Sequence, residues 1–451
     1  LLDENQLYIN PVNCFIYNPN NCDDECLVYL GVPSSYKTVT SLELQKSGAY
    51  VANDFDELAD SPIISSESIQ QKSLNVSGVN FHFCFQGEIR PDWNKIFTDF
   101  EKFISYQIKC FGSFPFKDYY FLFQITLSPS YHGVEHHKST VVLLGPSYDV
   151  FGKLYNEFLG VSSHELYHVW NIKGIRPEEM FPYDFSKENY TELGYVAEGV
   201  TTYMGDRMLF ESGVFSKIQY FNELIKLLKR HYHNDGRKNY SVAASSFDTW
   251  LDGYVAGIPS RKVSIYVEGA LIAFICDARI RKATNNSKSL HDVMSKMYSK
   301  NNKVTSYNKE KYKNLLEEVS GVVFDDVFEE LIYGCRDFTP FLENAMKSFG
   351  WSMSESKPIF CSHNFGMKVS NSNGFSKVVD ILQNGAADVS GIVEGDVIHS
   401  LNGIRLSNDI EKWLNYFDND DLILSIERKG ELKRIELQSP NKFRYYNYEI
   451  N

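Results

Sequence analysis

The chain has 451 residues, of which 43% are hydrophobic and 15% aromatic, and its formal net charge is −13. This length exceeds what a single hydrophobic core usually supports, so we expect two or three well-packed domains. The acidic charge and the lack of a sustained Lys/Arg run argue against a nucleic-acid partner. No segment reaches the roughly 18 uncharged apolar residues of a membrane span, so we expect a soluble chain without a membrane partner.

The cysteines and the start of the chain bear on the cellular compartment. The eight cysteines follow no disulfide-scaffold spacing, which predicts free thiols. No charged segment followed by an apolar stretch and a cleavage site is visible at the start, so a cytoplasmic location is favoured. Because the sequence opens on Leu1 instead of Met, we expect upstream residues to be missing.

The first two-thirds of the chain change from strand-like to helix-like patterns. Short apolar runs between Asn, Pro, Gly, Asp and Ser clusters predict a β-rich domain over residues 1–86. A spacing of apolar residues near 3.6 predicts a helix over 93–110. Strands are predicted at 119–127 and 139–145, followed by a long helical region over 148–349. Strands that lead into a helical lobe are typical of a multidomain α+β protein, with a second domain over 87–350.

The last hundred residues have a different pattern. The polar stretch after Gly350 predicts a linker. Residues 356–440 alternate short strands with Gly turns and end in a hairpin around Lys429 and Gly430. We therefore predict a small third domain over 356–440.

The segment "SSHELYHVWN" contains His164, Glu165 and His168 in the order H-E-x-x-H within a helical stretch. On a helix, residues i and i+4 lie about 40° apart, so both imidazoles project toward one point. Glu165 lies within the same arc, close enough to address a water molecule at a metal. This spacing predicts a zinc site with two histidine ligands and Glu165 as the general base. Two core histidines satisfied by hydrogen bonds are the alternative.

Catalytic zinc needs a third protein ligand and an open fourth position. The candidate acids downstream are Glu178, Glu179, Glu188, Glu192 and Glu198. The first two follow Pro177 in a loop-like stretch, whereas Glu198 lies on an apolar flank of a predicted helix. An unpaired carboxylate there would be costly and needs a cation. We therefore predict Glu198 as the third ligand of one zinc ion, with a helix-surface carboxylate as the alternative.

Five segments together resemble the glycyl aminopeptidase family of zinc peptidases. They are "DELADSPI" (56–63), "GVEHHKST" (133–140), "HELYHVWNIKGIRPEEM" (164–180), "YVAEGVTTY" (195–203) and "YVEGAL" (266–271). The resemblance covers nearly the whole chain and implies a thermolysin-like catalytic domain over 87–350, of the gluzincin type with two His and one Glu as ligands. It also implies an N-terminal β domain, incomplete in this sequence, and a C-terminal PDZ domain.

This resemblance implies roles for residues outside the metal site. Glu135 of "GVEH" occupies the place of a glutamate that captures the free α-amino group of the substrate. Tyr266 corresponds to a tyrosine whose hydroxyl hydrogen-bonds the developing oxyanion. The family's usual Lys two positions later is Glu268 here, which removes any contribution from that Lys. Arg176 also matches the family pattern, and a salt-bridged structural arginine and a binder of the substrate carboxylate are equally supported.

The stretches "NFGM" (364–367) and "NGAADVSGIVEGDVIHSLNG" (384–403) resemble a PDZ domain. Such a domain accepts a peptide by β-augmentation, and the loop before its second strand offers backbone N–H groups to the peptide carboxylate. The resemblance therefore implies Phe365, Gly366 and Met367 as peptide-binding residues and a peptide or protein C-terminus as a partner. A packing role for this domain is equally supported.

These observations predict a zinc-dependent aminopeptidase that acts on peptides with a free N-terminus. The resemblance implies a small N-terminal residue, Gly or Ala. One alternative is a zinc endopeptidase, which would ignore the free amine, and Glu135 argues against it. The other is a catalytically idle protein whose PDZ domain binds protein tails. The intact set of His164, Glu165, His168 and Glu198 argues against that alternative.

Overall fold

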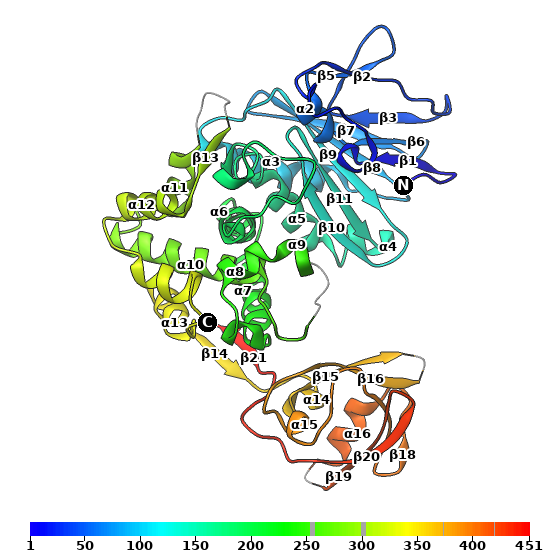
Figure 1. Cartoon of the computed structure of the whole chain (residues 1–451), viewed down its shortest axis with the longest axis vertical. Helices are drawn as coiled ribbons and strands as arrows, with labels where there is room; N and C mark the ends of the chain where they lie inside the picture. The colour runs from blue at the N-terminus through cyan, green and yellow to red at the C-terminus, as the bar shows by residue number, and fades with distance from the viewer. Residues whose placement is uncertain (253–257, 299–303, 373, 419) are drawn as a thin grey trace.

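The computed structural model describes residues 1–252, 258–298, 304–372, 374–418 and 420–451. A small β lobe, a central sheet, a helical lobe and a C-terminal domain follow one another along the chain (Figure 1). The predicted multidomain α+β class is therefore confirmed. Within the described ranges, no helix is both long and apolar enough to cross a membrane.

The N-terminal lobe contains two small antiparallel sheets, with the strand orders β1-β6-β3 and β2-β5-β4. The elements are β1 Gln6–Ile9, α1 Pro11–Cys14, β2 Cys26–Val28, β3 Lys37–Thr40, β4 Glu43–Leu44, β5 Tyr50–Ala52, α2 Phe55–Ala59 and β6 Ile63–Ser66. Val39 and Ile64 of this lobe pack against Cys84, Leu122 and Val141 of the central sheet. The lobe therefore covers one face of that sheet.

The central sheet has the strand order β10-β11-β9-β8-β7. Its elements are β7 Gln70–Val76, β8 Val79–Gln86, β9 Asp118–Ile125, β10 Ser130–Glu135 and β11 Ser139–Gly145. The three inner strands run parallel, and β7 and β10 pair antiparallel at the two edges. The predicted boundary between residues 86 and 87 thus falls inside this sheet, because β7 and β8 pair with strands that follow it. This sheet begins at β7.

Two helices cover the other face of the central sheet, α3 Trp93–Phe111 and α5 Tyr155–Tyr167. Phe100 of α3 and Phe158 of α5 pack against each other and against Phe121 and Phe123 of β9. The predicted helix over 93–110 is confirmed. Its packing fixes α5, which carries the H-E-x-x-H string, directly on the sheet.

The helical lobe follows the central sheet. Its helices are α4 Ser147–Val150, η1 Glu178–Met180, η2 Tyr195–Val200, α6 Thr201–Glu211, α7 Lys217–Tyr232, η3 Asp235–Lys238, α8 Val242–Phe247, α9 Thr249–Asp252, α10 Ile265–Ala283, α11 Leu290–Met297, α12 Lys309–Ser320, η4 Val327–Ile332 and α13 Thr339–Ser348. The predicted helical region over 148–349 is interrupted by a parallel pair, β12 Ile175–Pro177 and β13 Thr305–Tyr307. Pro177 explains the first strand, because a proline disfavours helical backbone at the residue before it.

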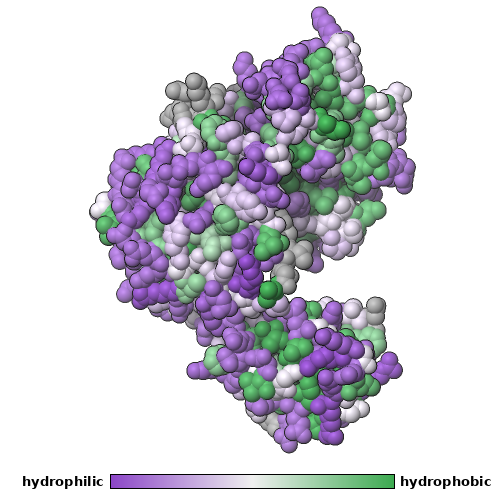
Figure 2. All heavy atoms as spheres, viewed as in Figure 1, coloured by the Kyte–Doolittle hydropathy of each residue, from purple (hydrophilic) through white to green (hydrophobic). Residues whose placement is uncertain are grey.

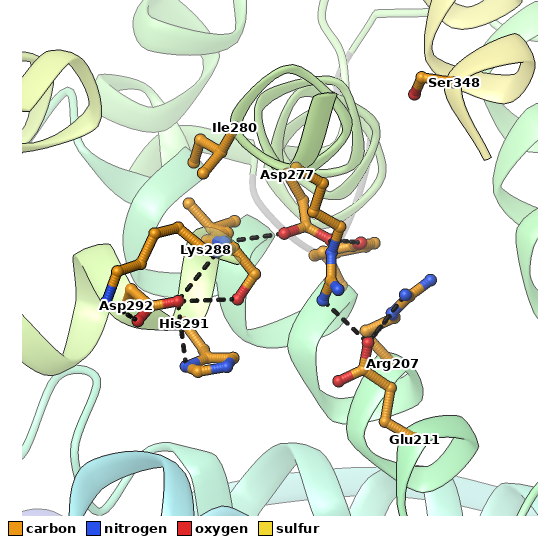
Figure 3. Close-up of polar contacts among 12 residues, drawn as sticks. Arg207, Glu211, Asp277, Ile280, Lys288, His291, Asp292 and Ser348 are labelled. Atoms are coloured by element: carbon orange, nitrogen blue, oxygen red, sulfur yellow. Dashed lines mark hydrogen bonds and ion pairs between the residues drawn. The ribbon is translucent and has the colours of Figure 1, made fainter. Parts of the chain in front are cut away.

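Helices α6 and α10 are joined by a charge network at the edge of the core (Figure 3). Glu211 of α6 accepts hydrogen bonds of 2.8 Å from Arg207 of its own helix and from Arg281 of α10. Asp277 of α10 accepts from Arg281 at 2.8 Å and from Tyr203 of α6 at 2.6 Å. Because α6 continues directly from η2, the network also fixes η2 relative to α10.

The C-terminal domain has its own hydrophobic core, which includes Met367, Ile398 and Leu424. Its sheet has the order β15-β16-β17-β19-β20, with β18 paired to β17. The elements are α14 Cys361–Asn364, β15 Met367–Ser372, β16 Phe375–Ile381, α15 Ala386–Val389, β17 Val397–Leu401, β18 Ile404–Arg405, α16 Ile410–Tyr416, β19 Leu422–Arg428 and β20 Glu431–Leu437. The hairpin at Lys429 and Gly430 is confirmed, and both residues have positive φ, 53° and 83°.

The segments before and after this domain pair with each other. β14 Met353–Ser356, which lies in the predicted linker, forms an antiparallel ribbon with β21 Asn447–Ile450. Tyr448 of β21 stacks on Tyr232 of α7 at 4.7 Å, so the end of the chain lies against the helical lobe (Figure 1). A recess separates much of the C-terminal domain from the rest of the molecule (Figure 2). The domain is thus attached to the helical lobe at both of its ends.

Candidate functional site

Helix α5 carries the H-E-x-x-H string at its C-terminal end. His164 lies in the last turn, and His168 is the C-cap residue, whose backbone stays in the right-handed helical region (φ −62°, ψ −19°). The Nε2 atoms of the two histidines therefore lie 3.1 Å apart. Buried Phe158 and Leu166 anchor the helix in the core.

The carboxylate of Glu198 lies beside the two imidazoles. Its Oε2 atom is 3.4 Å from Nε2 of His164 and 3.3 Å from Nε2 of His168. In a tetrahedral zinc site with bonds of about 2.0–2.1 Å, two ligand atoms lie about 3.3 Å apart. The three separations therefore match the ligand spacing of one ion. The sequence offered four other acids, Glu178, Glu179, Glu188 and Glu192. Among the described residues, none of them belongs to a group of side chains that could hold a metal ion.

Two carboxylate oxygens of this cluster are buried without a hydrogen-bond partner among the described residues, Oε2 of Glu198 and Oε2 of Glu165. A buried carboxylate oxygen without a donor is destabilising, and a cation would satisfy it. Burial opposes ionisation of Glu198, but His168 and His164 outweigh it and hold the pKa of this carboxyl well below its usual range. The residues present therefore fit a zinc ion in spacing, donor type and charge.

Asn171 orients the cluster from both sides. Its backbone carbonyl accepts a hydrogen bond of 2.8 Å from Nδ1 of His168, which leaves Nε2 on the side of Glu198. Its side-chain amide donates to the carbonyls of Val196 and Ala197 and to the hydroxyl of Thr201. Those acceptors belong to η2 and the start of α6, which carry Glu198. Asn171 thus connects the segment that carries the two histidines to the segment that carries Glu198.

Glu165 is buried, at 4% exposure, and faces the edge strand β10. A Cβ atom on Gly133 of β10 would lie 2.1 Å from Oε1 of Glu165, so a larger residue there would displace the carboxylate. Burial raises the pKa of Glu165; His168 opposes the rise, and Glu135 and Glu198 add to it. A carboxyl with a raised pKa is suited to accept and return a proton near neutral pH.

Glu135 is the last residue of β10, and its carboxylate lies close to Glu165 and His168. One ligand atom from each of these three residues lies within 4.8 Å of the others. β10 pairs with β11 on one side and is the edge of the sheet on the other. An extended peptide could therefore pair with β10 and bring its first residue to Glu135.

Tyr266 lies in the first turn of α10, and its ring centroid is 6.4 Å from that of His164. The structure therefore places Tyr266, the predicted oxyanion donor, next to the cluster of His164, His168 and Glu198. Glu268, which stands where the family usually has Lys, points elsewhere. It is buried at 2% exposure and accepts a hydrogen bond of 2.7 Å from Nδ1 of His231 on α7. This pair joins α7 to the start of α10.

Arg176, whose role the sequence left open, is buried in β12 at 4% exposure. Its Nε donates to the carbonyl of Ile172, and its guanidinium lies 3.7 Å from the ring centroid of Tyr183. None of the ion pairs among the described residues includes Arg176, and its charge opposes the burial that raises the pKa of Asp56. The guanidinium of Arg176 therefore stacks on the ring of Tyr183. The salt bridge that the sequence left open is not formed among the described residues.

The three residues assigned to a peptide-binding loop lie at the start of the C-terminal sheet. The amide of Phe365 donates to the carbonyl of Ser362 at 3.0 Å, and that of Gly366 donates to the carbonyl of His363 at 3.1 Å. Phe365 and Met367 are buried in the domain core. Two of the loop amides are thus engaged in local turns. The edge strand β15 next to them keeps one side without a strand partner in the described sheet.

Sequence reasoning missed Asp60, Asn171 and Lys173 as parts of the site. Asp60 hydrogen-bonds to His136, which follows Glu135, and to Lys173. The three residues lie in the segments "DELADSPI" and "HELYHVWNIKGIRPEEM", which carried the family resemblance. Their position in these two segments was the available signal in the sequence, but it does not show which residues they contact.

Comparison with known proteins supports a peptidase. Residues 157–272 match the family model of the M61 glycyl aminopeptidase, and residues 1–67 match that of the peptidase M61 N-terminal domain. These two matches support a peptidase of the M61 family. No curated protein matches the chain.

One solved structure matches the fold of the whole chain. The crystal structure of an aminopeptidase N family protein from Idiomarina loihiensis superimposes with a TM-score of 0.92 at 24% identity, covering 100% of this chain and 81% of that one. The M1 zinc metallopeptidase from Deinococcus radiodurans gives a TM-score of 0.46 at 12% identity, covering 68% of this chain and 63% of that one. A mutant of that enzyme bound to a Tyr-Ser-Ala substrate gives 0.45 at 12% identity, with coverages of 68% and 62%.

Proposed function

We propose that this protein is a zinc-dependent aminopeptidase that hydrolyses the first peptide bond of substrates with a free N-terminus. The observation that carries the proposal is the cluster of His164, His168 and Glu198, whose ligand atoms lie 3.1–3.4 Å apart next to the buried Glu165. The matches to the M61 family models support a peptidase independently.

His164, His168 and Glu198 would hold one zinc ion. A zinc ion bound there supplies Lewis acidity, which makes water a nucleophile near neutral pH. Glu165 accepts the proton of the attacking water and passes it to the nitrogen of the leaving peptide, so the C–N bond breaks and the amine leaves neutral. Tyr266 donates a hydrogen bond to the oxyanion of the tetrahedral intermediate.

Glu135 distinguishes an aminopeptidase from an endopeptidase in this proposal. Its carboxylate lies at the end of the edge strand and near Glu165, where it pairs with the α-ammonium of the substrate. That contact places the first peptide bond at the site of hydrolysis. A small first residue, Gly or Ala, is the preferred substrate by resemblance to the family.

The test is the hydrolysis of Gly and Ala reporter substrates with free and N-acetylated amines, together with the zinc content of the purified protein. We expect one zinc per chain, preference for the free amine, loss of turnover in Glu165→Gln, and a raised KM for free-amine substrates in Glu135→Gln. Equal turnover of acetylated substrates by the wild type would rule out the aminopeptidase. Full activity without zinc would rule out the metal site.

For the C-terminal domain we propose a PDZ domain that adds a peptide strand to β15. The strand order β15-β16-β17-β19-β20, with β15 at an open edge, and the separate core support this proposal. We expect β15 backbone amides to be perturbed in NMR spectra by a peptide with a free C-terminus. A library of C-terminal peptides that leaves those amides unchanged would refute it.

A further inference from the structure

A buried lysine, Lys173, shares its carboxylate partner, Asp60, with the segment that follows the proposed amine-binding Glu135. Lys173 is 6% exposed and follows the H-E-x-x-H helix, where its backbone N–H donates to the carbonyl of His168 at 3.0 Å. Burial opposes the charge of Lys173, but Asp60 raises its pKa most, and Tyr183 and Glu135 add to the rise. Lys173 in turn lowers the pKa of Glu165.

Asp60 of the N-terminal lobe pairs with this lysine. Its two carboxylate oxygens lie 2.9 and 3.1 Å from Nζ of Lys173. Asp60 is the C-cap residue of the short helix α2, so it comes from a different lobe than the lysine. Burial alone would raise the pKa of Asp60, but Lys173 and His136 hold it well below its usual range. Asp60 is therefore an anion in the folded protein and compensates the charge of Lys173.

The same carboxylate holds the segment that follows Glu135. Asp60 accepts a hydrogen bond of 2.9 Å from Nδ1 of His136 and one of 3.0 Å from the backbone N–H of His137. One side chain thus joins three segments of the chain, at α2, after β10 and after α5. It places Glu135 and the lysine in fixed positions relative to each other.

We propose that Asp60 is a positioning residue that keeps the ammonium of Lys173 away from Glu135, so that Glu135 stays available for the α-ammonium of the peptide. The inference rests on the proposed aminopeptidase function and adds that the N-terminal lobe controls the amine specificity. Without Asp60, the buried Lys173 needs another anion, and Glu135 is a carboxylate whose charge already acts on the lysine. The lysine would then occupy the substrate's subsite as an internal competitor.

The first experiment compares Asp60→Asn with the double variant Asp60→Asn/Lys173→Met. The single change keeps the shape of the side chain and leaves the lysine without its anion. We expect KM for Gly and Ala free-amine reporters to rise at least tenfold, with a smaller change in kcat. The double variant removes both charges, so we expect KM to return to within about threefold of the wild type. Equal impairment of both variants would show that Asp60 is only structural and would overturn the proposal.

The matched control is Glu57→Gln. Glu57 lies in the same helix α2 and pairs with Lys138, so it also connects the N-terminal lobe to the segment after β10. It does not contact Lys173 among the described residues. We expect its KM to stay within twofold of the wild type. A tenfold rise in this variant would mean that any loosening of the interface has the same effect, which would also overturn the proposal.

Inhibition gives a second readout, which does not depend on the folding of Asp60→Asn. The probe is glycinamide with N-acetylglycinamide as its neutral counterpart, and competition with the reporter substrate gives their inhibition constants. The double variant must keep the preference for the free amine, and loss of that preference overturns the proposal. If the wild type itself shows no preference, the proposed function fails. If the wild type prefers the free amine but KM does not recover in the double variant, only the proposed role of Asp60 is refuted.

Discussion

Gly199 of η2 and Gly269 of α10 are in direct backbone contact: a Cβ atom added to Gly199 would lie 2.4 Å from the Cα atom of Gly269. In the reverse direction, a Cβ atom on Gly269 would lie 2.7 Å from the Cα atom of Gly199. The two helical segments that carry Glu198 and Tyr266 therefore approach as closely as their backbones allow. The proposed third zinc ligand and oxyanion donor are brought together by this contact.

Gly199→Ala should separate these two segments. We expect a loss of stability of about 1–3 kcal/mol, because a methyl group in a packed contact forces the backbone to shift. We also expect loss of bound zinc, since Glu198 is the adjacent residue. Thermal unfolding and metal analysis measure the two effects. Gly160→Ala in α5 is the control, because its nearest neighbour would lie 3.7 Å away. Unchanged zinc content in Gly199→Ala would contradict this account.

Glu198→Gln should weaken zinc binding while leaving the fold intact. The amide keeps the size of the side chain but removes the negative charge that faces His164 and His168 at 3.4 and 3.3 Å. We expect substoichiometric zinc and at least a hundredfold loss of kcat/KM. Glu192→Gln, which changes an acid of the same region, serves as the control and should retain one zinc ion. Full zinc occupancy in Glu198→Gln would refute the assignment of the third ligand.

Asn171→Ala should lower zinc affinity without removing a ligand. The change deletes the amide that holds η2 through Val196, Ala197 and Thr201. Loss of such an outer contact typically weakens metal binding by about 10–100-fold. Competition with a chelator gives the affinity. Asn308→Ala, which removes the N-cap of α12, costs about 1 kcal/mol of stability but should leave zinc affinity unchanged.

The attachment of the C-terminal domain should weaken in acid. His233 at the end of α7 donates from Nε2 to the carbonyl of Tyr446 at 2.7 Å, and His363 lies in α14 beside it. Burial lowers the pKa of both from 6.5 to about 4. Between these values the unfolded chain binds more protons than the folded one. The two neutral histidines therefore stabilise the attachment fully above about pH 6.5, and this stabilisation is lost as the pH falls toward 4.

Limited proteolysis between pH 7 and pH 4 measures this effect as cleavage in the segments that join the domain to the helical lobe. In the variant His233→Gln/His363→Gln neither group titrates, and we expect the pH dependence in this window to become flat. Lys368 and Asp380 also face these histidines and should be left unchanged. An identical pH profile in the variant and the wild type would show that other groups control the attachment.

Much of the local structure followed from sequence patterns. The apolar spacing of residues 93–110 predicted α3, and the apolar runs near 119–127 and 139–145 predicted β9 and β11. The pattern did not show that β7 and β8 join the same sheet, because hydrogen bonding to β9 is set by partners far along the chain. It also did not show that the polar residues 353–356 form a strand. Their partner β21 lies about a hundred residues later.

The sequence by itself determined the pairing of His164 with His168 and the position of Glu165, because four residues of α-helix place side chains on one face whatever surrounds the helix. Only the tertiary structure shows that the predicted Glu198 lies beside them, whereas the other four candidate acids do not. It also decided that Asp60 pairs with Lys173, 113 positions away. Such contacts depend on how lobes and helices pack, and no local spacing encodes the distance between segments that meet only in the folded chain.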